Sequence, residues 1–145
     1  MIMKKLGFLV LALLLMIGTL FTGSAVAQSN EPAKQVKKTT PTEVYYFHLT
    51  RRCVTCQTVE KVTEQAVNES FPEAVKSGDV FFKSVNIEDK ENKALVKRLK
   101  VEGQSLLIVN GKEKVDIIDK GFMYAMSAPD KLKAVVKENI QKYQK

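Results

Sequence analysis

The segment 50-TRRCVTCQ-57 holds both cysteines of this 145-residue chain, with two residues between them. The continuous apolar run that precedes it, VYYFHL at 44–49, predicts a strand buried on both faces. Beyond the segment, Val59, Val62 and Ala66 recur at the spacing of one helix face. A CxxC pair at a strand-to-helix junction is typical of a redox-active dithiol.

The start of the expected helix favours chemistry at the first cysteine. The first N–H groups of a helix lack partners and its dipole favours negative charge there, so a thiolate at Cys53 is stabilised. Arg51 and Arg52 add positive charge beside it. Cys56 lies over the same helix end and can attack a mixed disulfide at Cys53. We therefore expect Cys53 to be the nucleophile and Cys56 the resolving thiol.

Other uses of the cysteine pair stay open. A structural zinc site needs about four ligands, and beyond the cysteines the chain offers His48 as its single histidine. A purely structural disulfide would close a very short loop, where the entropic stabilisation is smallest. A non-enzymatic module that holds a soft metal such as Cu(I) is a further alternative, as is an accessory subunit that passes electrons to one partner.

The N-terminus has the pattern of a signal peptide over 1–27. Lys4 and Lys5 form a positive start, residues 6–17 are apolar or Gly, and Ala25-Val26-Ala27 predicts cleavage before Gln28. The alternative is an uncleaved membrane anchor, although the apolar run is shorter than the roughly 20 residues of a membrane span. We expect an exported, periplasmic or otherwise extracytoplasmic protein, where disulfides form and persist.

The remaining chain is expected to hold one domain. Residues 28–42 are polar, contain Pro32 and Pro41, and predict a flexible linker before a domain at 43–145. Without the signal peptide the net charge falls from +7 to about +5, spread as single lysines. This pattern gives no argument for nucleic acid as a partner. A membrane is expected only if the N-terminal segment stays uncleaved, and the sequence indicates no oligomeric state.

Further elements follow the first helix. The sequence predicts strands at 80–87, 106–109 and 115–118, a helix from Asp89 as N-cap through Leu99, and a last helix that starts with Ser127 as its cap. Asn110-Gly111 indicates a type I′ hairpin turn. The first two long strands are expected to pair in parallel and the hairpin to add an antiparallel edge. The predicted fold class is α/β, with a mixed central sheet and helices on both faces.

These features resemble the thioredoxin superfamily, in a minimal version of its fold. More narrowly, Tyr45-Tyr46-Phe47-His48, the Arg51–Cys56 segment, Ser105-Leu106-Leu107 and Gly121-Phe122-Met123 are similar to the ArsF family of small exported thioredoxin-like proteins, a proposed nitrophenyl-compound nitroreductase subunit. The similarity covers about Glu43 to Tyr143.

The resemblance implies further site residues and some departures. Ser105 stands where thioredoxins have a cis-proline, so we expect a trans peptide or an altered loop there. Gln104 and Ser105 are still expected to face the cysteines and to orient substrate. Gly121 and Phe122 align with a loop that borders the active site. Phe47 replaces the family's buried acid, and His48 beside it is interpreted as a satisfied core histidine.

The sequence thus favours a thiol–disulfide oxidoreductase. Its substrate would be a cysteine-containing protein or a small disulfide, and the reaction would be exchange through a mixed disulfide at Cys53. No organic cofactor is expected, because no Gly-rich phosphate loop follows a strand, and no resident metal is expected. Phe122, Met123, Tyr124 and Met126 either form an apolar rim of the site or pack under the last helix.

Overall fold

The computed structural model describes residues 40–144, so the expected signal peptide and the linker up to residue 39 lie outside the described residues. The elements follow in the order β1 (Thr42–His48), α2 (Val54–Ser70), α3 (Pro72–Ser77), β2 (Val80–Asn86), the 3₁₀ turn η1 (Lys90–Asn92), α4 (Lys93–Leu99), β3 (Ser105–Asn110), β4 (Glu113–Asp116), α5 (Ile118–Tyr124) and α6 (Pro129–Gln141).

The four strands form one mixed sheet in the order β2-β1-β3-β4. β1 pairs in parallel with β2 and antiparallel with β3, and β4 returns antiparallel along β3. The predicted parallel pair and antiparallel edge are therefore both confirmed. Because β1 has a neighbour on each side, its backbone groups are paired along both edges, as a buried strand requires.

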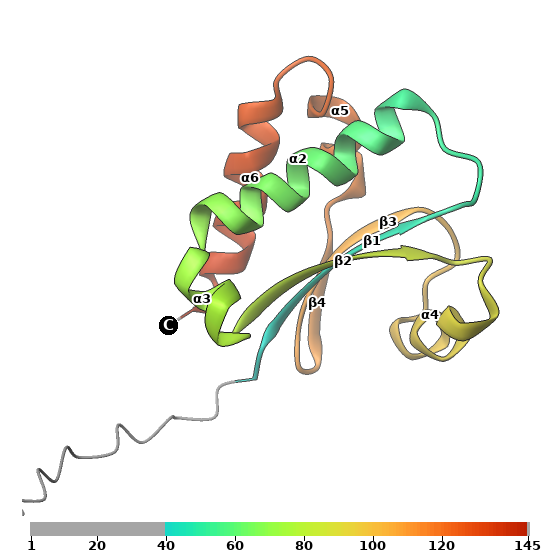
Figure 1. Ribbon diagram of the computed structural model, residues 1–145, viewed down its shortest axis with the longest axis horizontal. Helices are drawn as coiled ribbons and strands as arrows, with labels where there is room; N and C mark the ends of the chain where they lie inside the picture. The colour runs from blue at the N-terminus through green and yellow to red at the C-terminus, as the bar shows by residue number, and fades with distance from the viewer. Residues whose placement is uncertain (1–39, 145) are drawn as a thin grey trace, which may run out of the picture. The chain divides into compact units, whose positions relative to one another are not determined.

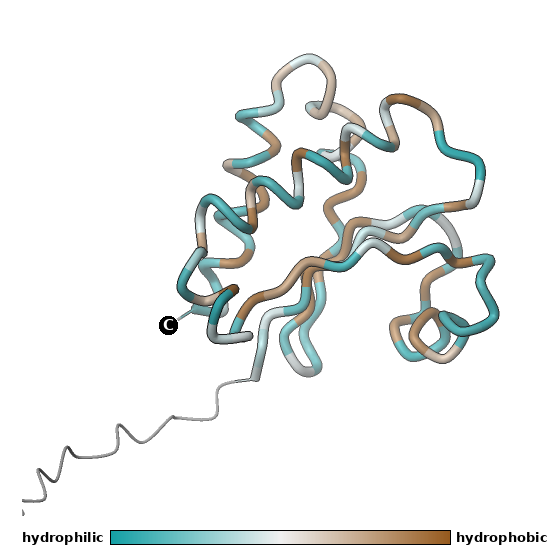
Figure 2. Tube along the Cα trace, in the orientation of Figure 1, coloured by the Kyte–Doolittle hydropathy of each residue, from teal (hydrophilic) through white to brown (hydrophobic). Residues whose placement is uncertain are grey.

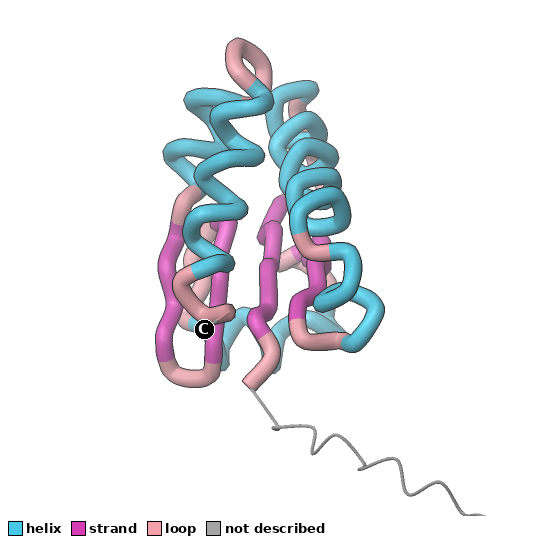
Figure 3. The backbone as a smooth tube through the Cα atoms, turned by 90° about the vertical axis from the view of Figure 1, so that its left-hand side faces the viewer, coloured by secondary structure: helices cyan, strands magenta, loops and turns pink. Residues whose placement is uncertain are grey.

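The sheet is covered on both faces. Val44 and Tyr46 of β1 face a core shared with α2 and α6, whereas Tyr45 and Phe47 face a second core closed by α4. α2 and α6 lie side by side on one face, and α4 lies on the other (Figure 1 and Figure 3). This arrangement confirms the predicted α/β fold with helices on both faces.

The hydrophobic pattern of the elements explains the layers. Figure 2 shows hydrophobic stretches along the strands, with hydrophobic and hydrophilic residues alternating along α2 and α6. The buried side of α2 comprises Cys56, Val59, Val62, Thr63, Ala66 and Val67. Cys56 thus lies on the same helix face as the core residues. Among residues 40–144, no helix combines the length and apolar character needed to cross a bilayer.

The second half of the chain differs from expectation at Val115–Ile118, which was predicted to be a strand. β4 ends at Asp116, and Ile118 begins the helix α5. The Asp116 carboxylate is the reason, because its Oδ1 accepts the backbone N–H of Ile118 at 2.9 Å and that of Leu106 at 3.1 Å. One side chain therefore ends the strand and binds the first turn of the helix.

The hairpin between β3 and β4 has a different turn from the predicted type I′. Asn110 pairs with Glu113, so the two central residues are Gly111 and Lys112. Gly111 has φ +62°, and among the described non-glycine residues only Lys100 has a positive φ. Glycine with positive φ at the first central position alone is the pattern of a type II′ turn.

Two predicted helix caps are wrong in detail. Asp89 precedes the 3₁₀ turn η1 without a side-chain cap bond and accepts a bond from the Asn86 amide instead. Ser127 donates to the carbonyl of Met123 at the end of α5, and Ala128 is the N-cap of α6. The following Pro129 presets the backbone of the first helical turn, so α6 begins without a side-chain cap.

Candidate active site

The cysteine pair lies at the start of α2, just after the loop that connects this helix to β1. Cys53 is the N-cap of α2 with an extended backbone, φ −80° and ψ 167°, and its Sγ accepts the backbone N–H of Cys56 at 3.2 Å. The two residues form a disulfide with a Cα–Cα distance of 5.2 Å, within the usual range. The sulfur of Cys53 thus occupies the position of an N-cap acceptor.

The two cysteines differ in exposure. Cys53 is exposed, whereas Cys56 is 5% exposed and faces the core side of α2. An incoming thiol or thiolate therefore reaches Cys53 from solvent, while Cys56 is covered. The difference comes from helix geometry, because Cys53 precedes the first turn and Cys56 already lies on the inward face.

Arg52 forms an ion pair with Glu60, which sequence reasoning did not single out. Both side chains are about three-quarters buried, with 25% and 22% of their surfaces exposed. Glu60 follows Cys56 by four residues, so the two share one side of α2. The four-residue spacing from Cys56 is the sequence feature that could have identified Glu60 as an acid on the same side of the helix. The pair offsets part of the charge that Arg52 brings to the site.

Tyr46 lies close to this ion pair. Burial raises the pKa of Tyr46 to about 12; the positive charge of Arg52 opposes that rise and the negative charge of Glu60 adds to it. The phenol is therefore neutral at physiological pH. Its buried hydroxyl has no hydrogen-bond partner among the described residues.

The loop before Cys53 is attached to the end of β2. The backbone N–H of Thr50 donates to Glu88 at 2.7 Å, and the Asn86 amide donates to the Thr50 hydroxyl at 3.0 Å. Parallel pairing brings the carboxyl ends of β1 and β2 together, which makes these contacts possible. Hydrogen bonds from the Thr50 side chain and backbone lower the pKa of Glu88. Arg51 in this loop is exposed.

We expect a Glu88→Gln substitution to weaken this attachment. The pKa of Glu88 is lowered on folding, so the stabilisation is fully present above its ordinary value of 4.5 and is lost as pH falls through the lowered value. The backbone amide proton of Thr50, followed by NMR, should titrate with a midpoint below 4.5. This titration should vanish in Glu88→Gln and persist in the control Glu91→Gln. A Thr50 signal that titrates identically in both variants would contradict the assignment.

Gln104 contacts the cysteine pair directly. Its Nε2 lies 3.6 Å from the Sγ of Cys56, as expected for a residue that faces the cysteines. Ser105 begins β3 opposite Phe47 and is buried. The expected trans peptide is confirmed, since no peptide bond among the described residues is cis.

Gly121 and Phe122 lie in the helix α5, so the expectation of a loop at this position is wrong. Gly121 is buried, and a Cβ there would lie 3.1 Å from Cγ1 of Val59 and 3.7 Å from Cδ2 of Leu106. Its structural role is the close approach of α5 to α2 and β3. Phe122 is 37% exposed, and Met123 and Met126 are more than half exposed, whereas Tyr124 packs against the core.

Phe47, which aligns with the buried acid of thioredoxins, and the adjacent His48 are placed differently from one another. Phe47 is fully buried in the core beneath α4. His48 is half-buried, and its Nδ1 lies 2.9 Å from the carbonyl oxygen of Leu49. The histidine therefore has a hydrogen-bond partner, as interpreted, but it lies at the edge of the core.

Comparison with known proteins adds no assignment: no protein-family model matches the sequence, and no curated protein matches it. The domain is thioredoxin-like in shape, with the CxxC disulfide at the start of a helix that packs on a four-stranded mixed sheet. Within residues 40–144, no group of three or more His, Cys, Asp and Glu side chains is arranged to hold a metal. This geometry is consistent with a redox-active site.

Proposed function

We propose that this chain is an exported thiol–disulfide oxidoreductase with Cys53 as nucleophile and Cys56 as resolving thiol. The observation that carries the proposal is the disulfide at the start of α2, in which Cys53 is exposed and Cys56 is buried. We propose export because the N-terminal sequence has the pattern of a signal peptide. Outside the cytoplasm, the disulfide would form and persist.

The reaction proceeds through a mixed disulfide. A substrate thiolate attacks Sγ of Cys53, the Cys53–Cys56 bond breaks, and Cys56 leaves as a thiolate. A second substrate thiolate then attacks the substrate sulfur of the mixed disulfide and releases Cys53. The substrate pair loses two electrons and becomes a disulfide, and the protein gains both as a dithiol. The reverse sequence reduces a substrate disulfide by attack of the Cys53 thiolate.

Several groups support the charged intermediates of this reaction. The free N–H groups at the start of α2 stabilise negative charge on Cys53. The Gln104 amide, 3.6 Å from Cys56, can donate to that sulfur when it leaves as a thiolate. The backbone N–H and carbonyl groups of Leu106 are already bonded to Asp116 and Ile117 on the outer edge of β3, and those of Ser105 face β1. An extended substrate can therefore pair with the backbone at Gln104.

Equilibration with glutathione tests the function. We expect the purified domain to exchange reversibly with reduced and oxidised glutathione, with two electrons per molecule and a glutathionylated species at Cys53. Metal analysis of protein purified under reducing conditions provides the opposing result. Stoichiometric copper or zinc on the thiols, together with no exchange, would replace the oxidoreductase by the metal-binding module.

The Arg52–Glu60 pair gives a prediction for the redox potential. Stabilising the Cys53 thiolate stabilises the reduced protein and raises the potential, so Glu60→Gln should raise it and Arg52→Ala should lower it. Each charge contributes about 0.3–1 kcal/mol at this range, which corresponds to about 6–20 mV for a two-electron couple.

Arg51→Ala is the matched control for this prediction. Arg51 is exposed and forms no ion pair within the described part of the chain, so its removal should lower the potential less than Arg52→Ala, which also leaves Glu60 without its partner. The double variant Arg52→Ala/Glu60→Gln should lie near the wild-type potential. Redox potentials that are identical for all four variants and the wild-type protein would show that these charges do not determine the potential of the cysteine pair.

We further propose that the chain is related to the thioredoxin superfamily and, more narrowly, to the ArsF family that its motifs resemble. The thioredoxin-like shape of the domain supports the broader relationship. The substrate proposed for the site is a cysteine-containing protein or a small disulfide, because the reactive sulfur is open to solvent.

A further inference from the structure

A second polar site lies on the α4 side of the molecule. A cavity of about 370 Å³ is formed between the end of α4 and the β3–β4 hairpin. Its lining residues are Arg98, Leu99, Lys100, Val109, Gly111, Lys112 and Lys114. Four of these seven residues are cationic, and no acidic side chain lines the cavity. Such a concentration of one charge in a concave site favours an anionic ligand.

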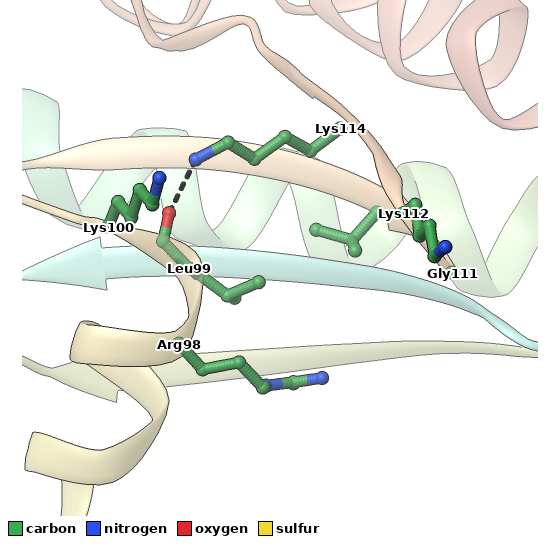
Figure 4. Close-up of a pocket in the computed structure, with 7 residues that line it drawn as sticks. Arg98, Leu99, Lys100, Gly111, Lys112 and Lys114 are labelled. Atoms are coloured by element: carbon green, nitrogen blue, oxygen red, sulfur yellow. Dashed lines mark hydrogen bonds between the residues drawn. The ribbon is translucent and has the colours of Figure 1, made fainter.

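The four cations are held at different places around the cavity. Figure 4 shows Lys100 and Lys114 at one end and Lys112 at the other, with Arg98 below them. Lys114 donates to the carbonyl of Leu99, and this bond brings its ammonium group across to the end of α4. The hydrogen bond fixes the position of the lysine, and its charge has no carboxylate partner among residues 40–144.

Only part of this positive charge is offset. Arg98 donates to Glu43 at 3.2 Å and lies 3.5 Å from the Tyr45 hydroxyl. Lys100, Lys112 and Lys114 form no ion pair within residues 40–144. Lys100 also has φ +53°, a backbone conformation in which glycine is favoured. The strained position therefore carries a long cationic side chain at the edge of the cavity.

The cavity also has an apolar component. Leu99 and Val109 belong to the core beneath α4, with 6% and 2% of their surfaces exposed, and contribute to the lining. A ligand complementary to this cavity has a negatively charged group that binds the lysines and a short apolar part that packs against Leu99 and Val109. We propose that the cavity binds a small organic anion, with a phosphate or carboxylate group held by the ammonium groups of Lys100 and Lys114 at one end of the cavity.

This site is separate from the cysteine pair. The hairpin lies beside the first residues of β1, because Thr42 pairs with Asn110, whereas the chain reaches Cys53 from the opposite end of that strand. The cavity also opens on the face covered by α4, and α2 covers the other face. Binding in the cavity is therefore independent of the oxidoreductase proposal.

NMR titration of the isotope-labelled protein tests the site. The probes are phenyl phosphate, benzoate, inorganic phosphate and the neutral benzyl alcohol, each added at constant ionic strength. We expect phenyl phosphate and benzoate to shift the backbone amides of Leu99, Lys100 and Gly111 saturably. Inorganic phosphate should bind at least threefold more weakly than phenyl phosphate, and benzyl alcohol should cause no saturable shift.

The variants separate the cavity from the general surface charge. Lys100→Gln/Lys114→Gln should weaken phenyl phosphate binding at least tenfold, and Lys76→Gln/Lys137→Gln, which removes the same charge from exposed positions elsewhere, should stay within twofold of wild type. Unchanged amide shifts of the β1 residues establish that each variant is folded. Equal weakening in both double variants would overturn the site. Equal affinity for inorganic and phenyl phosphate would overturn the organic ligand class.

Discussion

A Cys53→Ser variant is expected to lose disulfide exchange with glutathione, with a rate at least about a thousandfold below wild type. Cys53 is the exposed sulfur of the pair, whereas Cys56 is 5% exposed on the core side of α2. A serine hydroxyl in its place is not a nucleophile at neutral pH, and Cys56, the one cysteine that remains in the sequence, is buried. The measurement is the exchange rate under pseudo-first-order conditions.

The Cys56→Ser variant separates the two steps of the reaction. It retains the exposed Cys53 thiol and is expected to accumulate a mixed disulfide, detected as one added glutathione in the intact mass. In the reduced wild-type protein, alkylation near neutral pH should label Cys53 much faster than Cys56. Equal labelling rates, or a stable adduct on Cys56 in the Cys53→Ser variant, would reverse the assigned roles.

The same Cys56→Ser variant can identify the physiological partner. A protein substrate attacked by Cys53 stays covalently bound when the resolving thiol is absent. Mass spectrometry of the trapped adducts therefore reports the substrate directly. The Cys53→Ser/Cys56→Ser double variant controls for non-covalent association.

The parts of the fold that sequence reasoning predicted correctly rest on strong local patterns. The run at 44–49 is continuously apolar because β1 is central and covered on both faces, and the helical spacing after Cys56 reflects the single buried side of α2. In contrast, Val115 to Ile118 is apolar enough for a strand. Its division between β4 and α5 depends on the Asp116 carboxylate, which accepts hydrogen bonds from the backbone N–H groups of Leu106 and Ile118. Leu106 lies ten residues from Asp116 in the sequence.

In the candidate site, too, the sequence predicted the residues that belong to local motifs and missed the contacts that depend on the tertiary structure. The cysteines and Gln104 follow from their motif and from the resemblance, and the structure places Gln104 against Cys56. The contacts of the loop before Cys53 depend on tertiary register. Thr50 reaches Glu88 because His48 pairs with Asn86 across β1 and β2. The cationic cavity also requires the end of α4 and the hairpin to meet, which no local pattern indicates.

Gly121 shows how a residue in a site motif can act through packing. A Gly121→Val variant is expected to lose about 2–3 kcal/mol of unfolding free energy, because an overpacked core forces neighbouring side chains and backbone to move. The Cβ alone would lie 3.1 Å from Cγ1 of Val59, and the added methyl groups would need further space between α5 and α2. Val59 and Leu106 are fully buried, so neither side chain can move out into solvent to make that space.

Gly121→Ala is the control that isolates this steric effect. The first Cβ requires Val59 to shift by a few tenths of an ångström, and replacing glycine by alanine within a helix contributes about 0.8–1 kcal/mol in the opposite direction. The alanine variant should therefore stay within about 1 kcal/mol of wild type in urea denaturation, with an unchanged rate of exchange with glutathione. If Gly121→Val were equally stable but slow in exchange, Gly121 would belong to the substrate site as its motif suggests. A large loss of stability with exchange retained in the folded fraction assigns it to the contact between α5 and α2.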